Sequence, residues 1–165
     1  MLVTPHAAIA LEHLGHANRV DFEVEYTKAG ESIVTWFSEA PRPTDDEILA
    51  AVVPGLKNRA ALTIKGEASR RILAIAPLWK QNNLSARFAE LTAKRIDQYP
   101  LPLSHAEQDE YAAIKASGQY LLSIRTASNS MEAECAALST VAAVEAYMAG
   151  IDADLASAPR TVEWP

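Results

Sequence analysis

The sequence has little cysteine, a minority of basic residues and no long apolar run, and each scarcity excludes a class of protein. Cys135 is the only cysteine among 165 residues, so neither a disulfide framework nor a CxxC metal motif is expected, and such usage fits a reducing compartment. Lys and Arg number 15 against 21 Asp and Glu, which argues against a nucleic-acid-coating protein. No apolar run approaches the ~20 residues of a membrane span. We therefore expect neither nucleic acid nor a membrane as a partner.

Sequence motifs of known catalytic chemistry are also missing. There is no GxSxG, phosphate loop or HExxH, and no spacing of Ser, His and Asp indicates a triad. His13 and His16 stand at i,i+3, a spacing that two metal ligands could use, but no third ligand follows at a convincing spacing. We interpret them as polar residues of a surface helix. We likewise interpret residues 45–47, Asp-Asp-Glu, as acidic groups in a helix's first turn. The sequence thus predicts no enzyme, no metal and no cofactor.

Alternating polarity near the N-terminus predicts a β-hairpin. Residues 20–26, VDFEVEY, place an apolar side chain at every second position. Gly30 in the following loop can adopt positive φ, and residues 32–37, SIVTWF, form the return strand. A short helix is predicted before the hairpin, over residues 5–14, with Gly15 as its stop. A lone two-stranded hairpin is marginally stable, so it must pack on a helix or pair with another chain's strand.

The aromatic residues of this hairpin form the predicted partner-binding site: Phe22, Tyr26, Trp36 and Phe37. One short helix cannot cover both faces and both edges of the hairpin, and exposed aromatic residues are favoured interface anchors. The alternative is that the aromatic residues pack under the helix that follows, which we favour for Phe22 and Val24. Because Trp36 and Phe37 point to opposite sides of the strand, at least one of them is hard to bury within this unit.

A proline-rich connector leads into the next helix. After Pro43, the pair Thr44 and Glu47 forms a capping box that starts a helix at Asp45. This helix is predicted to run to about Val53 and to stop at residues 54–55, Pro-Gly. The expected domains are therefore a β-hairpin plus helix unit over 1–55, and a helical hairpin or arm with a C-terminal tail over 56–165.

A second proline breaks the helical segment that follows. Pro77 has no amide proton and its ring clashes with the preceding turn, so one helix should end near Ala76 and another should start at Pro77. A polar cluster stands directly behind the break and contains Trp79, Gln81, Asn82 and Asn83. We expect Trp79, buried, and at least one of the side-chain amides to satisfy the backbone groups at this break.

The longest predicted helix opens with a second capping box at Ser104 and Glu107 and extends for about 35 residues. A helix this long in a chain of this size should pair antiparallel with residues 77–96 or with another subunit's copy. Its apolar stripe is longer than residues 77–96 can cover, so we expect self-association or a stable complex with another protein. Gly118 and Ser128 would let a neighbouring helix approach closely. The predicted fold class is α+β: an N-terminal β-hairpin with short helices, then a mainly α-helical hairpin with a long C-terminal helix.

The C-terminal region adds two smaller expectations. Thr140 is predicted to cap a short helix over residues 141–148, which Gly150 would close. Trp164, one residue from the end of the sequence, suggests docking of the tail rather than fraying.

Composition and spacing alone indicate a mostly helical domain and do not say what it does, but three segments resemble a known family. Glu31–Val52, ESIVTWFSEAPRPTDDEILAAV, joins a strand ending in Trp to a Pro-Thr-x-x-Glu helix start, carried by Trp36, Pro43, Thr44 and Glu47. Ile72–Arg87, ILAIAPLWKQNNLSAR, is similar to a Pro-x-Trp-Lys-Gln-x-Asn segment, here Pro77, Trp79, Gln81 and Asn83 with Lys80 between them. Ser123–Tyr147 looks like the C-terminal helices of the same proteins. These are small tail-module proteins of tailed bacteriophages, of the tail fibre assembly or tail-associated type.

The resemblance implies a non-enzymatic structural protein of the bacteriophage virion. It would join or accompany a tail fibre or baseplate protein in the viral tail, as an oligomer, after assembly in the host bacterial cytoplasm. A dissociable tail-fibre assembly chaperone is the second interpretation. A small-molecule or metal enzyme, and a cytosolic bacterial regulator unrelated to phage, are the alternatives from other classes. The family pattern holds no catalytic residue, so none is carried over to this sequence.

Overall fold

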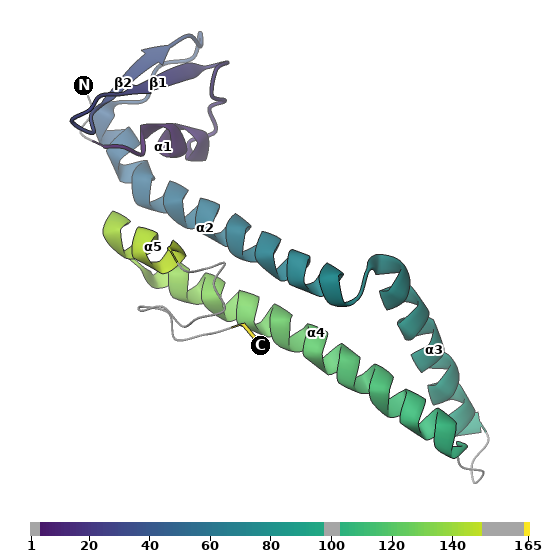
Figure 1. Ribbon diagram of the computed structural model, residues 1–165. Coiled ribbons are helices and arrows are strands. Elements are labelled where there is room, and N and C mark those ends of the chain that lie inside the picture. Colours follow the sequence, from purple (N-terminus) through teal and green to yellow (C-terminus); the bar gives the residue numbers. More distant parts are fainter. Residues whose placement is uncertain (1–3, 98–102, 150–163) are drawn as a thin grey trace. The chain divides into compact units, whose positions relative to one another are not determined.

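The computed structural model describes residues 4–97, 103–149 and 164–165, and this part of the chain is mostly helical (Figure 1). The elements in chain order are α1 (Ala7–His13), β1 (Phe22–Tyr26), β2 (Ser32–Trp36), α2 (Asp45–Ile75), α3 (Leu78–Asp97), α4 (His105–Ala137) and α5 (Val141–Met148). The described residues fall into two compact units, 4–63 with 132–149, and 64–97 with 103–131 and 164–165. The expected N-terminal hairpin and the mainly helical structure of the chain are confirmed, whereas the helix after the hairpin is long rather than short. The expected domain boundary at residue 55 lies inside α2 and stays a prediction.

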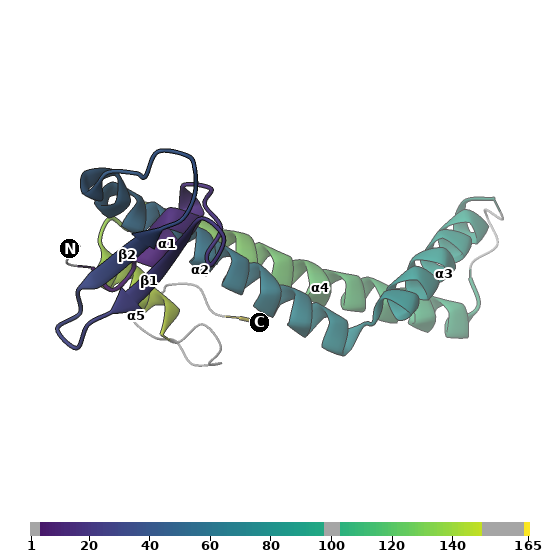
Figure 2. The same cartoon turned by 90° about the horizontal axis from the view of Figure 1, so that it is seen from above.

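The hairpin forms as its alternating sequence predicts. β1 and β2 pair antiparallel, with Phe22 opposite Trp36 and Tyr26 opposite Ser32. Gly30 adopts φ +80° in the connecting turn, a conformation that residues with a side chain rarely take. Figure 2, which views the molecule from above, shows the two strands beside α1. The Ser32 hydroxyl donates a hydrogen bond to the Thr4 carbonyl, and both residues are buried. The segment before α1 is thereby fixed to the start of β2.

The predicted helix stop at Pro54 and Gly55 is wrong, because α2 runs through both residues. Pro54 is exposed, and so is Ala50, whose carbonyl loses its helical donor, so water can satisfy that carbonyl. Gly55 is instead a contact point between α1 and α2: a Cβ there would lie 2.8 Å from the Ile9 carbonyl oxygen. The residue that resembles a helix terminator in the sequence therefore allows two helices to approach closely.

The buried face of α2 combines larger aliphatic side chains with alanine. It includes a row at every fourth residue, Ile48, Val52, Leu56, Ala60, Ile64, Ala68 and Ile72, which buried Ala76 continues just beyond the helix. Larger apolar side chains also stand on the exposed face of α2, since Leu62 is 70% exposed and Leu73 and Ile75 are also exposed. Alanine carries little hydrophobic signal in a sequence, yet it permits close packing of helices. In the second unit, Ala68 and Ile72 pack with Ile124 of α4.

The second unit pairs α3 with the first part of α4 in antiparallel fashion, as expected. Arg87 forms a bidentate ion pair with Glu110, at 3.0 and 2.7 Å, and Lys94 pairs with Glu107. The rings of Phe88 and Tyr111 stack with centroids 4.9 Å apart. These contacts lie toward the C-terminal end of α3, and Figure 1 shows the two helices diverging from there toward the break before α3.

Most of the predicted helix ends are confirmed. α2 ends at Ile75 and α3 begins at Leu78, on either side of Pro77. Glu107 accepts hydrogen bonds from the Ser104 backbone N–H and hydroxyl, which is the predicted capping box. The Thr140 hydroxyl accepts from the Ala143 N–H at the start of α5. Gly150, the predicted stop of α5, lies outside the described residues.

Trp164 docks on the second unit, as predicted. Its side chain packs against the cluster of Ala68, Ile72 and Ile124, and the Arg71 guanidinium lies 5.1 Å from the centroid of its ring. The carbonyl of Pro165 accepts a hydrogen bond from the Tyr120 hydroxyl at 3.1 Å. The last two residues are therefore held by both α2 and α4.

Candidate functional site

The four aromatic residues predicted to bind a partner divide into a buried and an exposed set. Phe22 is fully buried, which is the fate that the alternative interpretation favoured for it. Tyr26 and Phe37 are 50% and 54% exposed, at opposite ends of the hairpin. Trp36 is half-buried. Of the four, Tyr26 and Phe37 therefore offer the most surface to a partner protein.

Trp36 is held in place by two contacts within the first unit. Its indole Nε1 donates a hydrogen bond to the Ala40 carbonyl at 2.8 Å, across the start of the connector. The imidazole of His16 meets its ring edge-on, with centroids 4.8 Å apart. These contacts fix the end of β2 to the segment after α1. Trp36 thus acts as a structural anchor, and Phe37 next in the chain is the more exposed of the two.

The pairing register shows which backbone groups of the hairpin face outward. The Thr27 N–H donates to the Glu31 carbonyl, and the Phe37 N–H donates to the Asp21 carbonyl. In an antiparallel hairpin, hydrogen-bonded residue pairs such as these alternate with non-hydrogen-bonded pairs. Val24 and Val34 form a non-hydrogen-bonded pair between them, and their N–H and C=O groups therefore point away from the hairpin. On β1 the Phe22 carbonyl accepts from the Arg19 N–H. Within the described part of the chain, no backbone partner is recorded for the outward groups of Val24 and Val34.

The connector motif has a structural role in the observed geometry. The Glu47 carboxylate accepts from the Thr44 N–H at 2.7 Å and from its hydroxyl at 2.8 Å, and the Thr44 hydroxyl accepts from the Glu47 N–H. The backbone hydrogen bond from Thr44, followed by that from its side chain, lowers the pKa of Glu47. Pro43 precedes this box and is half-buried. The motif fixes the entry into α2, just after the hairpin.

At the Pro77 break, the expectation for the side-chain amides is confirmed and that for Trp79 is wrong. The Gln81 side-chain amide donates to the Ala76 carbonyl at 2.6 Å, which satisfies a backbone acceptor at the end of α2. Trp79 is 66% exposed and so does not close the break as a buried aromatic would. Asn83 is also exposed. The Pro77 carbonyl accepts the first N–H groups of α3, from Lys80 and Gln81, so backbone groups also satisfy the break.

Histidines of the N-terminal region bind neighbouring side chains. Asn58 Nδ2 and His13 Nδ1 lie 2.9 Å apart, which links α1 to α2. His6 Nε2 lies 3.1 Å from Glu145 Oε1 and links the segment before α1 to α5. His6 and Glu145 border a hollow of about 550 Å³, which Glu12 and Arg59 also line. No group of three or more His, Cys, Asp or Glu side chains in the described ranges is placed to hold a metal ion.

Several polar contacts could not be predicted from the sequence, because they join residues far apart along the chain. The Lys57 ammonium donates to the Ala136 carbonyl at 2.7 Å, and the Tyr147 hydroxyl donates to Glu134 at 2.9 Å. Both tie the C-terminal part of α4 into the first unit. Glu67, almost fully buried, accepts hydrogen bonds from Arg70 and Arg71, and the bond from Arg70 is the main cause of its lowered pKa. Burial raises the pKa of the Cys135 thiol.

No family model matches this sequence, and neither a curated protein nor a solved structure was found that resembles it. A search of the described residues for a helix long and apolar enough to cross a bilayer found none.

Proposed function

We propose that this chain is a non-enzymatic protein of a bacteriophage tail that binds a tail fibre or baseplate protein through its N-terminal hairpin. The observation that carries the proposal is the outward-facing backbone of Val24 and Val34, flanked by the exposed Tyr26 and Phe37. An open strand edge can accept a strand from another chain, and aromatic side chains at its ends supply anchoring contacts. The resemblance of residues 31–52 and 72–87 to tail-module proteins supplies the class of partner.

The geometry around the hairpin supports a binding role for this element. The hydrogen bond from Ser32 to Thr4 and the contacts of Trp36 with Ala40 and His16 hold both ends of β2 to neighbouring segments of the first unit. A strand edge presented on a fixed support loses little conformational freedom when a partner strand pairs with it. The charged residues Glu23 and Glu25 stand on the exposed face of β1, where they disfavour unselective pairing between hairpins.

The proposal also includes self-association and residence in the virion tail, following assembly in the host cytoplasm. Exposed apolar side chains on the helices, such as Leu62 and Trp79, support contact with other copies of the chain. A tail component remains in purified particles, whereas a dissociable assembly chaperone is absent from them. Mass spectrometry of purified virions therefore separates the two versions of the proposed function.

Proline substitution at the outward-facing positions tests the edge directly. Val24→Pro and Val34→Pro each remove an outward N–H without removing a hairpin hydrogen bond, so the hairpin should persist. If a partner strand pairs with one edge, the variant of that edge should bind the neighbouring tail fibre or baseplate protein about tenfold more weakly, the effect of losing about 1.4 kcal/mol. The measurement is biolayer interferometry with the purified partner.

Threonine substitutions at the same positions are the matched controls. Val24→Thr and Val34→Thr keep the backbone N–H and the β-branched shape, so they should bind as the unaltered chain does. Circular dichroism checks that all four variants retain the same fold. Unchanged binding by both proline variants would show that the partner contacts another surface.

A further inference from the structure

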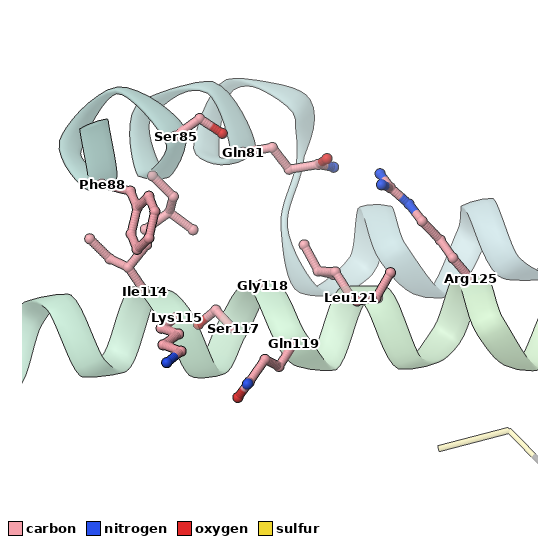
Figure 3. A pocket seen from close by; sticks show the side chains of 12 residues that line it. Gln81, Ser85, Phe88, Ile114, Lys115, Ser117, Gly118, Gln119, Leu121 and Arg125 are labelled. Atoms are coloured by element: carbon pink, nitrogen blue, oxygen red, sulfur yellow. The ribbon is translucent and has the colours of Figure 1, made fainter. Parts of the chain in front are cut away.

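A groove in the second unit lies where α3 and α4 diverge. It has a volume of about 560 Å³ and is bordered by the first turns of α3 and by α4 from Ile114 to Arg125 (Figure 3). Its apolar side chains are Leu84 and Phe88 of α3 and Ile114, Leu121 and Leu122 of α4. Leu122 is 60% exposed. Stacking of Phe88 on Tyr111 closes the groove at one end, while the divergence of the helices leaves the rest open.

The groove is lined by positively charged residues, although the chain has a net charge of −6. Lys115 and Arg125 are the charged groups that line it, and no acidic residue is among the lining residues that the structure describes. Neither cation forms a recorded ion pair with a described residue. In Figure 3, Gln81 and Arg125 point toward one another between α3 and α4, whereas Lys115, near the other end, extends from the side of α4 that faces away from α3. Ten residues of helix separate the two cations, which corresponds to about 15 Å.

Gly118 lies between these cations on α4, one helical turn from Lys115 and about two turns from Arg125. A Cβ at this position would meet nothing within 4 Å, so no packing within the described chain requires a glycine there. Glycine in a helix interior costs about 1 kcal/mol relative to alanine. Its absence of a side chain leaves bare backbone on the floor of an apolar groove, where a second helix could approach closely. The sequence analysis anticipated a close neighbour at Gly118, and none of the described residues supplies it.

The groove continues along α4. An adjoining hollow of about 460 Å³ shares Gln119 and Leu122 with it, extends to Ser130 and is bordered by Pro165, with no Asp or Glu side chain among its described lining residues. From Lys115 to Ser130 the strip is about 22 Å long, or roughly four helical turns. A surface of this length, apolar in the middle and basic at intervals, fits an amphipathic helix rather than a small molecule.

We propose that this groove binds an acidic amphipathic helix of a partner protein. The apolar face of that helix would cover Leu121, Leu122 and the bare backbone at Gly118, and its carboxylates would pair with Lys115 and Arg125. A second copy of this chain fits less well: antiparallel packing of two copies of the strip would set Lys115 against Arg125 of the partner subunit, and like charges repel. This surface is separate from the hairpin edge, so the inference does not rest on the proposed function.

Three synthetic 18-residue helices test the inference. They share one face of leucine and alanine and carry glutamate, glutamine or lysine at the flanking positions, with a fluorescein label for anisotropy measurements on the full chain. At low salt the glutamate peptide should bind on the order of tenfold more tightly than the lysine peptide. The glutamate peptide can form two partly exposed ion pairs, with Lys115 and Arg125, whereas the lysine peptide is repelled by both residues. This difference should shrink as salt is added.

Two variants locate the binding in the groove. Lys115→Glu combined with Arg125→Glu should reverse the order, so that the lysine peptide binds best. Gly118→Leu should fill the strip and weaken the binding of all three peptides about tenfold. Lys28→Glu combined with Arg59→Glu is the charge-matched control in the first unit, and it should leave the order unchanged. Thermal unfolding of each variant checks that the fold is retained.

The opposite results overturn the inference. It is wrong if the glutamate peptide binds no more tightly than the other two, if no peptide binds, or if reversal of Lys115 and Arg125 leaves the order as it was. It is also wrong if sedimentation of the chain alone shows a dimer that Gly118→Leu dissociates, since the groove would then hold a second copy.

Discussion

Gly55 and Gly66 show at the scale of single residues why identical residues in one helix can have opposite roles. Both lie within α2. A Cβ at Gly55 would lie 2.8 Å from the Ile9 carbonyl oxygen and 3.0 Å from Ile9 Cγ2, whereas a Cβ at Gly66 would meet nothing within 4 Å. The first glycine allows α1 to pack on α2, and the second has no such contact.

Alanine substitution should therefore have opposite effects at the two glycines. Gly66→Ala should raise the free energy of unfolding by about 0.5–1 kcal/mol, through helix propensity alone. Gly55→Ala should lower it by about 1–3 kcal/mol, because the backbone of Ile9 must move away. Urea unfolding followed by circular dichroism measures both. A stabilised Gly55→Ala variant would contradict the close packing of α1 on α2.

At the scale of elements, the break between α2 and α3 depends on an amide and not on the aromatic residue beside it. The Ala76 carbonyl lies at a buried position and receives the Gln81 side chain at 2.6 Å. Trp79 is exposed, so its removal deletes few contacts within the chain. The sequence identified the break correctly and expected Trp79 and at least one of the amides of Gln81, Asn82 and Asn83 to close it. In the structure Gln81 makes this contact, whereas Trp79 is exposed.

Gln81→Ala should destabilise the second unit by about 1–2 kcal/mol, since it leaves a buried carbonyl without its side-chain donor. Trp79→Ala should change the free energy of unfolding by less than about 0.5 kcal/mol. Asn83→Ala removes an exposed amide from the same turn and serves as the matched control, with an equally small effect. Chemical denaturation of the three variants makes the comparison. A large loss in Trp79→Ala would restore the buried-aromatic interpretation.

At the scale of the whole molecule, carboxylates at helix ends and between helices link stability to pH. The pKa of Glu107 is lowered to about 2, first by the hydrogen bond from Lys94 and then by those from Ser104. Hydrogen bonds from Arg87 lower the pKa of Glu110, and Arg87 in turn has a raised pKa, mainly through Glu110. Glu47 and Glu67 also have lowered pKa values. The native state therefore binds fewer protons than the unfolded state in mildly acidic solution.

The free energy of unfolding should consequently be highest above pH 4.5, the ordinary value for these groups, and should fall as the pH drops toward 2. Glu107→Gln should make this decline shallower, because the substituted side chain cannot bind the proton. Glu39→Gln alters an exposed carboxylate in the connector and should leave the slope as it is. Urea titrations across this pH range give the slopes. An unchanged slope in Glu107→Gln would contradict the assignment.

Local features of the sequence determined most of the secondary structure. Alternation over residues 20–26 and the positive φ at Gly30 set the hairpin, and the Thr44–Glu47 and Ser104–Glu107 capping boxes set the starts of α2 and α4. These signals could be read because each involves groups only a few residues apart, whose hydrogen bonds and steric limits depend on local backbone geometry. They also indicated that Tyr26 and Phe37 belong to one small sheet, although not which aromatic residue would be buried.

Only the tertiary structure decided what the interrupting residues do. Pro54 remains inside α2 because it faces solvent, and Gly55 is buried because α1 crosses at that point. The groove around Gly118 has Lys115 and Arg125 at its borders. It arises because α3 contacts α4 at Phe88, and the two helices diverge from there toward Gln81 at the start of α3. The exposure of a side chain depends on which distant residues pack beside it. A residue's type and its sequence neighbours limit that outcome without fixing it.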